Sequence, residues 1–255
     1  MGCKLINFND TYPAKIIIDA PYGDDSFELN DKWKADFTPA DYELFEHASE
    51  LRTLCSFLDR HIHEHINLHN IIKNCKSILF LGIGRLKDTY LNTLLKYFPY
   101  LNEIHIIDKA QREILLQYEY LKFLKINNNI DFILHLKNIF DMPNIKVDCL
   151  FYSSIFERSL FTPPQQVLTL LQLLKISKKN TLFISYRGLD DDILYWYWNY
   201  EFQKYFSFLA CIHDLLIFHQ LQKEFSQEEL RELIMNDEDL LAYVRKMNTM
   251  RDVLD

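Results

Sequence analysis

The sequence predicts an α/β fold in which a doubly wound, mostly parallel sheet of about seven strands ends in an antiparallel hairpin. Three observations predict it. Short apolar runs alternate with helical patterns from residue 76 onward. The first of them, 77–81, has four consecutive apolar residues, as is typical of a parallel strand buried on both faces. Two further apolar runs, 206–212 and 215–221, are separated only by His213 and Asp214, which is the pattern of a hairpin.

Five of the runs are expected to form the parallel strands, namely residues 77–81, 103–107, 131–136, 147–152 and 180–186. Helices are expected between them at 87–98, 110–125 and 163–175, and an aromatic-rich helix at about 190–204. Because parallel neighbours need crossover connections, which are nearly always right-handed, this alternation predicts helices that cover a central sheet.

The two ends of the chain are expected to form mainly helical extensions. Residues 1–37 look irregular apart from a short strand at 15–19, and the sequence from Thr38 to Asp41 has the residues of a helix start. The tail shows two helical stretches capped by Ser226 and Asn236. We therefore expect an N-terminal extension and helical cap over 1–75, an α/β domain over 76–225 and an acidic helical tail over 226–255.

The net charge of −8 comes from the ends of the chain. Residues 1–45 contain nine acidic and four basic residues, and residues 226–255 contain eight and four, which leaves 19 acidic and 20 basic residues between them. The central domain is therefore near neutral and shows no broad basic surface for nucleic acid. No apolar run approaches the roughly 20 residues of a membrane span. The five cysteines contain no CxxC pair, so we expect free thiols, no structural metal and a cytoplasmic protein.

Glycines and polar residues follow the predicted strands, at the edge where doubly wound sheets bind their ligands. Gly82 and Gly84 would let the backbone approach a ligand closely. Asp108 closes the second strand 24 residues after Gly84, and its carboxylate can accept hydrogen bonds from both hydroxyls of a ribose. Asn138 and Asp141 follow the third strand, and either could meet an adenine amine.

Tyr152 and Ser153 end the fourth strand, and Glu157 lies in the loop that follows. Glu157 could act as a general base or orient an amine. The same loop could instead be the start of a helix with a serine cap, and both interpretations stay open.

Taken together, these motifs resemble the class I S-adenosylmethionine-dependent methyltransferases, a Rossmann-like family, over about residues 76–221. The resemblance implies S-adenosylmethionine as cofactor and methyl transfer as the reaction. It places the cofactor on Gly82, Gly84, Asp108, Asn138 and Ser153, and the transferred group near Tyr152 and Glu157. The first motif departs from the family in two places. Phe80 stands where the family has an acid that holds the methionine amino group, and Leu86 stands where it has a third glycine.

Residues 44–54 are also similar to the His-Ala-Ser helix of aminoglycoside-resistance 16S ribosomal RNA guanine-N7 methyltransferases, although the Gly-x-Asn-Pro and basic N-terminal domain of that family are missing. Nicotianamine and opine-type synthases, which transfer aminocarboxypropyl from the same cofactor, are a further alternative. A degenerate methyltransferase fold that serves as a binding module is another. From the charge distribution we expect a small-molecule or protein acceptor rather than RNA.

Two clusters admit a functional and a plain interpretation. His61, His65 and His69 would share one helix face, where they could bind a metal, but a solvated flank beside the apolar stripe is favoured. The aromatic segment 195–198 would cover every face of a helix, which favours a core and lid contact over a platform for a planar substrate.

Overall fold

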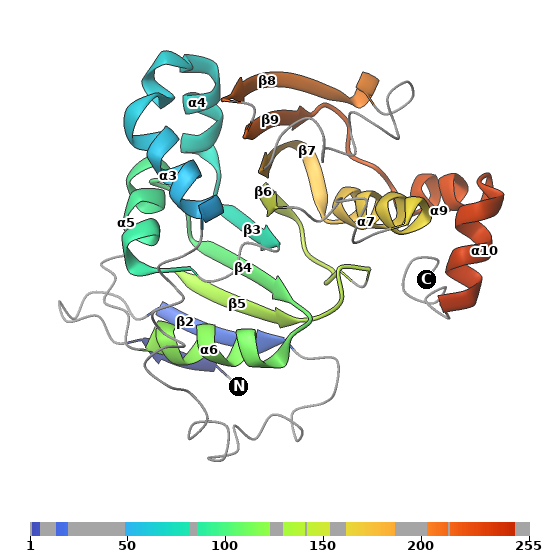
Figure 1. Ribbon diagram of the computed structural model, residues 1–255, viewed down its shortest axis with the longest axis horizontal. Helices are drawn as coiled ribbons and strands as arrows, with labels where there is room; N and C mark the ends of the chain where they lie inside the picture. Colours follow the sequence, from blue (N-terminus) through green and yellow to red (C-terminus); the bar gives the residue numbers. More distant parts are fainter. Residues whose placement is uncertain are drawn as a thin grey trace. The chain divides into compact units, whose positions relative to one another are not determined.

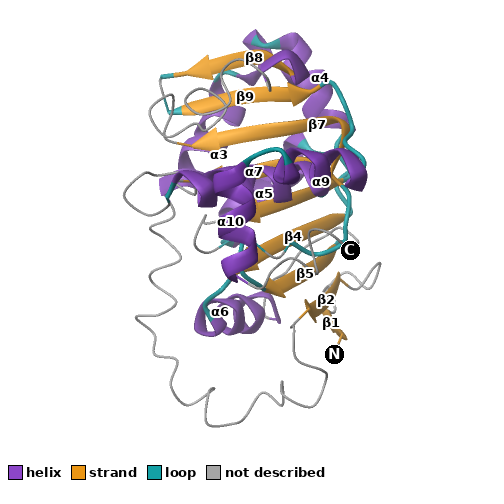
Figure 2. Ribbon diagram, turned by 90° about the vertical axis from the view of Figure 1, so that its right-hand side faces the viewer, coloured by secondary structure: helices purple, strands orange, loops and turns teal. Residues whose placement is uncertain are grey.

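The structure is a computed structural model that describes residues 2–5, 14–19, 49–81, 86–122, 130–140, 142–153, 162–186, 203–213 and 215–247. The chain divides into two compact units, Met1–Lys137 and Asn138–Asp255. Strands and covering helices occur in both units, as Figures 1 and 2 show.

The strands described in the first unit are β1 (Gly2–Leu5), β2 (Ala14–Asp19), β3 (Ser77–Leu81), β4 (Glu103–Asp108) and β5 (Asp131–Leu136). Their order is β1-β2-β5-β4-β3, and all pairs are parallel except β1 with β2. The helices are α3 (Ser49–Arg60), α4 (Ile66–Asn74), α5 (Asp88–Tyr97) and α6 (Gln111–Lys122), with a 3₁₀ turn, η3 (Ile62–Glu64), between α3 and α4. α3 and α4 pack against α5, and α6 packs against β4 and β5.

The core of this unit follows from its apolar runs. All five residues of β3 are buried, and Ile78, Leu79 and Phe80 are fully inaccessible to solvent. A strand buried on both faces needs apolar residues at every position, which is why the run is continuous rather than alternating. In α5, Leu91 and Leu94 are three residues apart and both fully buried, so one face of this helix faces the core.

The second unit contains β6 (Val147–Ser153), β7 (Ser177–Tyr186), β8 (Phe206–Ile212) and β9 (Leu216–Leu221), in the order β6-β7-β9-β8. β6 and β7 are parallel, whereas β9 pairs antiparallel with both β7 and β8. The helical elements are α7 (Pro163–Lys175), a 3₁₀ turn η4 (Gln203–Tyr205), α9 (Gln227–Met235) and α10 (Glu238–Met247). α9 and α10 pack against each other and against α7.

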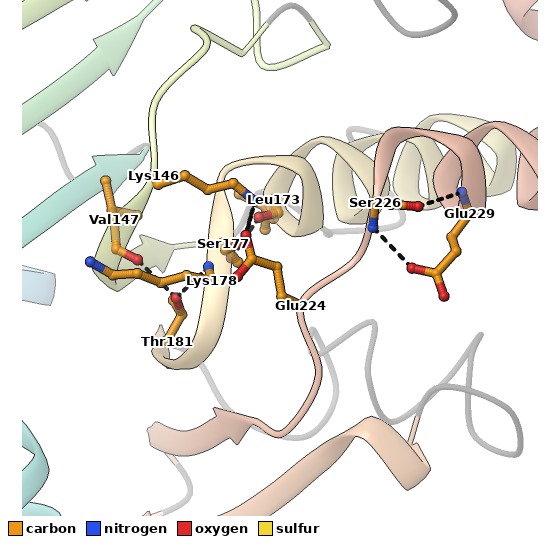
Figure 3. A network of polar contacts seen from close by, with 9 residues as sticks. All are labelled: Lys146, Val147, Leu173, Ser177, Lys178, Thr181, Glu224, Ser226 and Glu229. Atoms are coloured by element: carbon orange, nitrogen blue, oxygen red, sulfur yellow. Dashed lines mark hydrogen bonds and ion pairs between the residues drawn. The ribbon is translucent and has the colours of Figure 1, made fainter.

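Polar contacts tie these elements together (Figure 3). The hydroxyl of Thr181, fully buried at the start of the parallel part of β7, donates to the carbonyl oxygen of Val147 at 2.8 Å and accepts from the N–H of Lys178 at 3.0 Å. Lys146, just before β6, forms an ion pair of 2.8 Å with Glu224, in the segment that leads to α9. Thr181 therefore stabilises the pairing of β6 with β7, and Lys146 holds the segment that leads to the C-terminal helices.

The predicted fold class is confirmed. A doubly wound, mostly parallel Rossmann-like sheet with a C-terminal antiparallel hairpin is present, and the strands predicted between residues 77 and 221 occur as β3 to β9. Two more strands, β1 and β2, lie at one edge of the sheet. β2 coincides with the short strand expected at 15–19, whereas β1 was not predicted because its four residues show no apolar pattern.

The helical extensions differ from the sequence prediction in two details. η3 separates α3 from α4, so His61, His65 and His69, which were expected on one helix face, do not share one continuous helix. In the tail, Ser226 caps α9 as predicted, but Asn236 ends α9 instead of starting α10. Asp237 takes that role, because its Oδ1 accepts the N–H of Leu240 at 2.9 Å.

Four expectations concern residues outside the described ranges. They are the helix start at 38–41, the turn at Gly82 and Gly84, the loop with Glu157, and most of the aromatic helix at 190–204. Within the described ranges, every helix is too short or too polar to cross a bilayer.

Candidate functional site

The carboxyl ends of the parallel strands of the first unit are level with one another. Register pairs Leu81 with Ile107, Asp108 with Leu136, and Asp19 with His135. The pairing of β4 and β5 extends one residue further, since the N–H of Lys137 donates to the carbonyl oxygen of Asp108 at 3.1 Å. This edge is where doubly wound sheets bind ligands, and it carries the acid that the sequence singled out.

Asp108 is half-buried at the end of β4. Its Oδ1 accepts the N–H of Ala110 at 2.8 Å, at the point where the chain turns into α6. Burial raises the pKa of the Asp108 carboxyl, and hydrogen bonds from the backbone N–H groups of Ala110 and Lys109 oppose this rise. A carboxylate held in this way by the start of a helix is a preorganised acceptor for hydroxyl groups.

The two departures from the family motif have different consequences. Phe80, at the position of the family's acid, is fully buried within β3 and lies beside Ile106 of β4. A group at this position faces the core, so the described strand supplies no carboxylate for an amino group there.

Leu86, at the position of the third glycine, is also fully buried. Among the described residues other than glycine, positive φ occurs at Asn180 and His213, so the backbone of Leu86 is not left-handed. Leucine therefore adopts this conformation without the strain that glycine would relieve. Both backbone polar groups of Leu86 are bonded to the side chain of Gln117, its N–H at 2.8 Å and its carbonyl oxygen at 3.0 Å.

The remaining predicted residues belong to the second unit or lie outside the described ranges. Asn138 is exposed, and its Oδ1 accepts the N–H of Phe140 at 3.2 Å, which closes a local turn. Tyr152 and Ser153 are buried at the carboxyl end of β6, where register places them beside Ser185 and Tyr186 of β7. Gly82, Gly84, Asp141 and Glu157 lie outside the described residues.

Tyr152 and Ser153 are thus brought together at one strand end, and Asp108 stands at the corresponding edge of the first unit. Their assignment to cofactor and acceptor stays a prediction. Tyr152 packs edge-on against Phe183, with ring centroids 6.5 Å apart. Such packing fixes the direction of the ring within the core of the second unit.

A buried polar chain in the first unit was missed by the sequence analysis. Nδ1 of His105 in β4 lies 2.9 Å from Nε2 of His135 in β5, and Nδ1 of His135 lies 2.8 Å from a carboxylate oxygen of Asp19 in β2. The two rings are nearly parallel, at an angle of 9°. A charged side chain lies at each end of this hydrogen-bonded row. Lys137 is 3.4 Å from Asp19, and Glu103 is 3.5 Å from His105.

This arrangement determines where the protons lie. Because a carboxylate only accepts, Nδ1 of His135 carries a proton toward Asp19, and its Nε2 accepts from Nδ1 of His105. Burial lowers the pKa of His135 to about 4, and it lowers that of His105 although Glu103 opposes the shift. Both rings are therefore neutral at neutral pH. A histidine inside each of two adjacent apolar strands was the available signal.

The cluster between α3 and α4 does not form a ligand set. His61 contacts Glu64 at 3.3 Å, His65 packs near the ring of Phe57, and His69 packs near Tyr97. In the part of the chain that the structure describes, no three His, Cys, Asp or Glu side chains are arranged to hold a metal ion.

The structure resembles those of known methyltransferases. No protein-family model matches the sequence, and no curated protein sequence does. The N-methyltransferase NodS from Bradyrhizobium japonicum WM9 is 12% identical over 65% of this chain and 97% of that one, with a TM-score of 0.43. A second structure of NodS, in complex with S-adenosyl-L-homocysteine, is 11% identical over 75% and 92% of the two chains, also with a TM-score of 0.43. An O-methyltransferase family protein from Burkholderia thailandensis is 11% identical over 67% and 59% of the two chains, with a TM-score of 0.42.

Proposed function

We propose that this protein is an S-adenosylmethionine-dependent methyltransferase with a small-molecule or protein acceptor. The observation that carries the proposal is the place of Asp108 at the carboxyl end of β4, level with the ends of β3 and β5 and held by the start of α6. An acid there can accept hydrogen bonds from both ribose hydroxyls of a nucleoside cofactor. The parallel pairing of β3, β4 and β5 also supports it, because ligands of doubly wound sheets bind beyond the carboxyl ends of parallel strands.

Methyl transfer needs few acid–base side chains from the protein. When bound, S-adenosylmethionine would supply a methyl group on its sulfonium, which would pass to the acceptor's lone pair and leave S-adenosylhomocysteine. Catalysis therefore depends on holding the two reactants close together and in line. We assign cofactor binding to Gly82, Gly84, Asp108, Asn138 and Ser153, and contact with the acceptor to Tyr152 and Glu157. An acceptor that arrives as a proton-bearing amine or hydroxyl must lose that proton, for which Glu157 is the candidate base.

The acceptor class is proposed from charge. The acidic ends of the chain and its net charge of −8 would repel a polyanion, which disfavours RNA as the acceptor.

The test is calorimetric titration with S-adenosylmethionine and S-adenosylhomocysteine. Asp108→Ala is expected to weaken binding by about 1.5–3 kcal/mol, or roughly 10- to 150-fold, because hydrogen bonds to a charged group are lost. Asp131→Ala is the matched control, since it removes the same charge at the amino end of β5. Unchanged affinity of folded Asp108→Ala would refute the role of Asp108, and a wild-type protein that binds neither compound would refute the function.

One observation favours a second candidate, a degenerate methyltransferase fold that serves as a binding module and has lost the cofactor site. The buried Phe80 leaves β3 without the acid that holds the methionine amino group in the family. The calorimetric titration separates the two, because the enzyme is expected to bind S-adenosylmethionine and S-adenosylhomocysteine and the degenerate module is expected to bind neither.

A further inference from the structure

Gln117 links the middle of α6 to the residue that ends the glycine motif. Its side chain is 2% exposed, and both ends of its amide are used on Leu86. Oε1 accepts the N–H of Leu86 at 2.8 Å, and Nε2 donates to the carbonyl oxygen of Leu86 at 3.0 Å. One buried amide thus satisfies both backbone groups of one buried residue, in the way that two paired strand residues satisfy each other.

A second contact from the same helix fixes the next segment. Tyr120 lies nearly one turn after Gln117, and its hydroxyl accepts the N–H of Asp88 at 3.1 Å and donates to Oδ1 of Asp88 at 3.2 Å. Asp88 is the first residue of α5. The side chains of α6 therefore hold both the end of the motif and the start of the helix that follows it.

The other end of α6 adjoins the candidate ribose acid. Asp108 accepts the N–H of Ala110, and α6 begins at Gln111. Since an α-helix is stiff over such a length, the positions of Asp108 and Leu86 are set relative to each other by one element. Under the proposed function, the ribose would bind to Asp108 and the rest of the cofactor near the glycine motif that Leu86 ends, so this relation would set the geometry of the site.

Resting on the proposed function, we infer that Gln117 is a positioning residue of the cofactor site. In glycine-rich nucleotide motifs a third glycine permits close packing of helix on strand. Here a leucine side chain occupies the core at that position, and the tie to Gln117 fixes the backbone. Because the N–H of Leu86 is bonded to Gln117, a bound cofactor would accept its backbone hydrogen bonds from other residues.

The experiment measures affinity for S-adenosylhomocysteine and the free energy of unfolding for the same variants, under conditions where each is folded. Gln117→Leu keeps the size of the side chain and removes both hydrogen bonds, and it is expected to weaken binding about tenfold. Gln117→Glu keeps an acceptor for the Leu86 N–H but places a buried carboxylate oxygen against the Leu86 carbonyl oxygen, and it is expected to weaken binding at least tenfold.

The control is Thr181→Val, which also removes two buried hydrogen bonds but lies at the amino end of the parallel part of β7. It should lose stability and keep its affinity within about twofold. Amide exchange at Leu86 should be faster in Gln117→Leu than in wild type, which tests the tie without cofactor.

Wild-type affinity in folded Gln117→Leu and Gln117→Glu would overturn the inference while the proposed function stood. Should Gln117→Leu fail to fold, Gln117→Glu decides the point alone. Absence of binding by the wild-type protein would instead remove the proposed function, and the role of Gln117 in it.

Discussion

Acidification should destabilise the first unit through His135. The folded protein holds this histidine neutral, because burial lowers its pKa to about 4, whereas a histidine in the unfolded chain titrates near 6.5. As the pH falls below about 6.5, the unfolded chain takes up the proton first, so the free energy of unfolding decreases. The stability contributed by neutral His135 is complete above that pH and is lost progressively down to about pH 4.

The magnitude follows from the two pKa values. One pKa unit corresponds to about 1.4 kcal/mol, so the difference between 6.5 and about 4 amounts to about 3 kcal/mol in total. Between about pH 7.5 and pH 5, the part of this that is lost is about 2 kcal/mol. Burial alone would raise the pKa of Asp19, but the hydrogen bond from His135 and the charge of Lys137 lower it. Its contribution is therefore lost at lower pH, outside this window.

The assay is urea unfolding followed by circular dichroism at several pH values. His135→Gln should be less stable than wild type at neutral pH, because Asp19 and His105 lose their partner. Its stability should fall by about 2 kcal/mol less than that of wild type on going to pH 5. His63→Gln serves as control, since the His63 side chain is 71% exposed. Parallel curves for wild type and His135→Gln across this window would refute the reasoning.

Two further changes test the second unit. Thr181→Val should cost about 1–3 kcal/mol of unfolding free energy, because the Val147 carbonyl and the Lys178 N–H lose the buried hydroxyl, and a loss below about 0.5 kcal/mol in chemical denaturation would contradict that role. Ser226→Ala should cost about 1 kcal/mol, because Ser226 accepts the N–H of Glu229 while Glu229 accepts the N–H of Ser226, a reciprocal cap at the start of α9. The check is the thermal unfolding midpoint of Ser226→Ala, with Ser207→Ala in β8 as the control. Equal midpoints for the two variants would count against a stabilising cap at Ser226.

The strands were predictable because each is a short run whose apolar character reflects burial on both faces, as in β3. Asp108 was predictable as the acid at the end of β4, since the distance from the glycines is set by one strand-helix-strand unit. The caps were less certain. Asn236 and Asp237 are neighbours with nearly equal capping ability, and only the geometry of the turn selects Asp237.

The features that were missed depend on contacts between distant parts of the chain. Leu86 looked like the loss of a glycine, and its tie to Gln117, 31 residues further on, is invisible to any local pattern. The hydrogen-bonded row of Asp19, His135 and His105 joins three strands, and other elements separate these residues in the sequence. Periodicity shows which residues are buried, but it does not show which buried polar groups meet.

The pairing of β2 with β5 has a consequence for how the chain reaches its native state. Asp19 and His135, which bond across this pair, are 116 residues apart in sequence. Contacts between residues so far apart in sequence form late, because the entropy of closing a long loop is lost before the contacts contribute stability. During synthesis the strand Ala14–Asp19 leaves the ribosome well before its parallel partner exists. Its apolar centre, Ile16 to Ile18, is then an unpaired edge that can recruit another nascent chain. Pairing with residues 131–136 covers this edge of β2 in the native sheet.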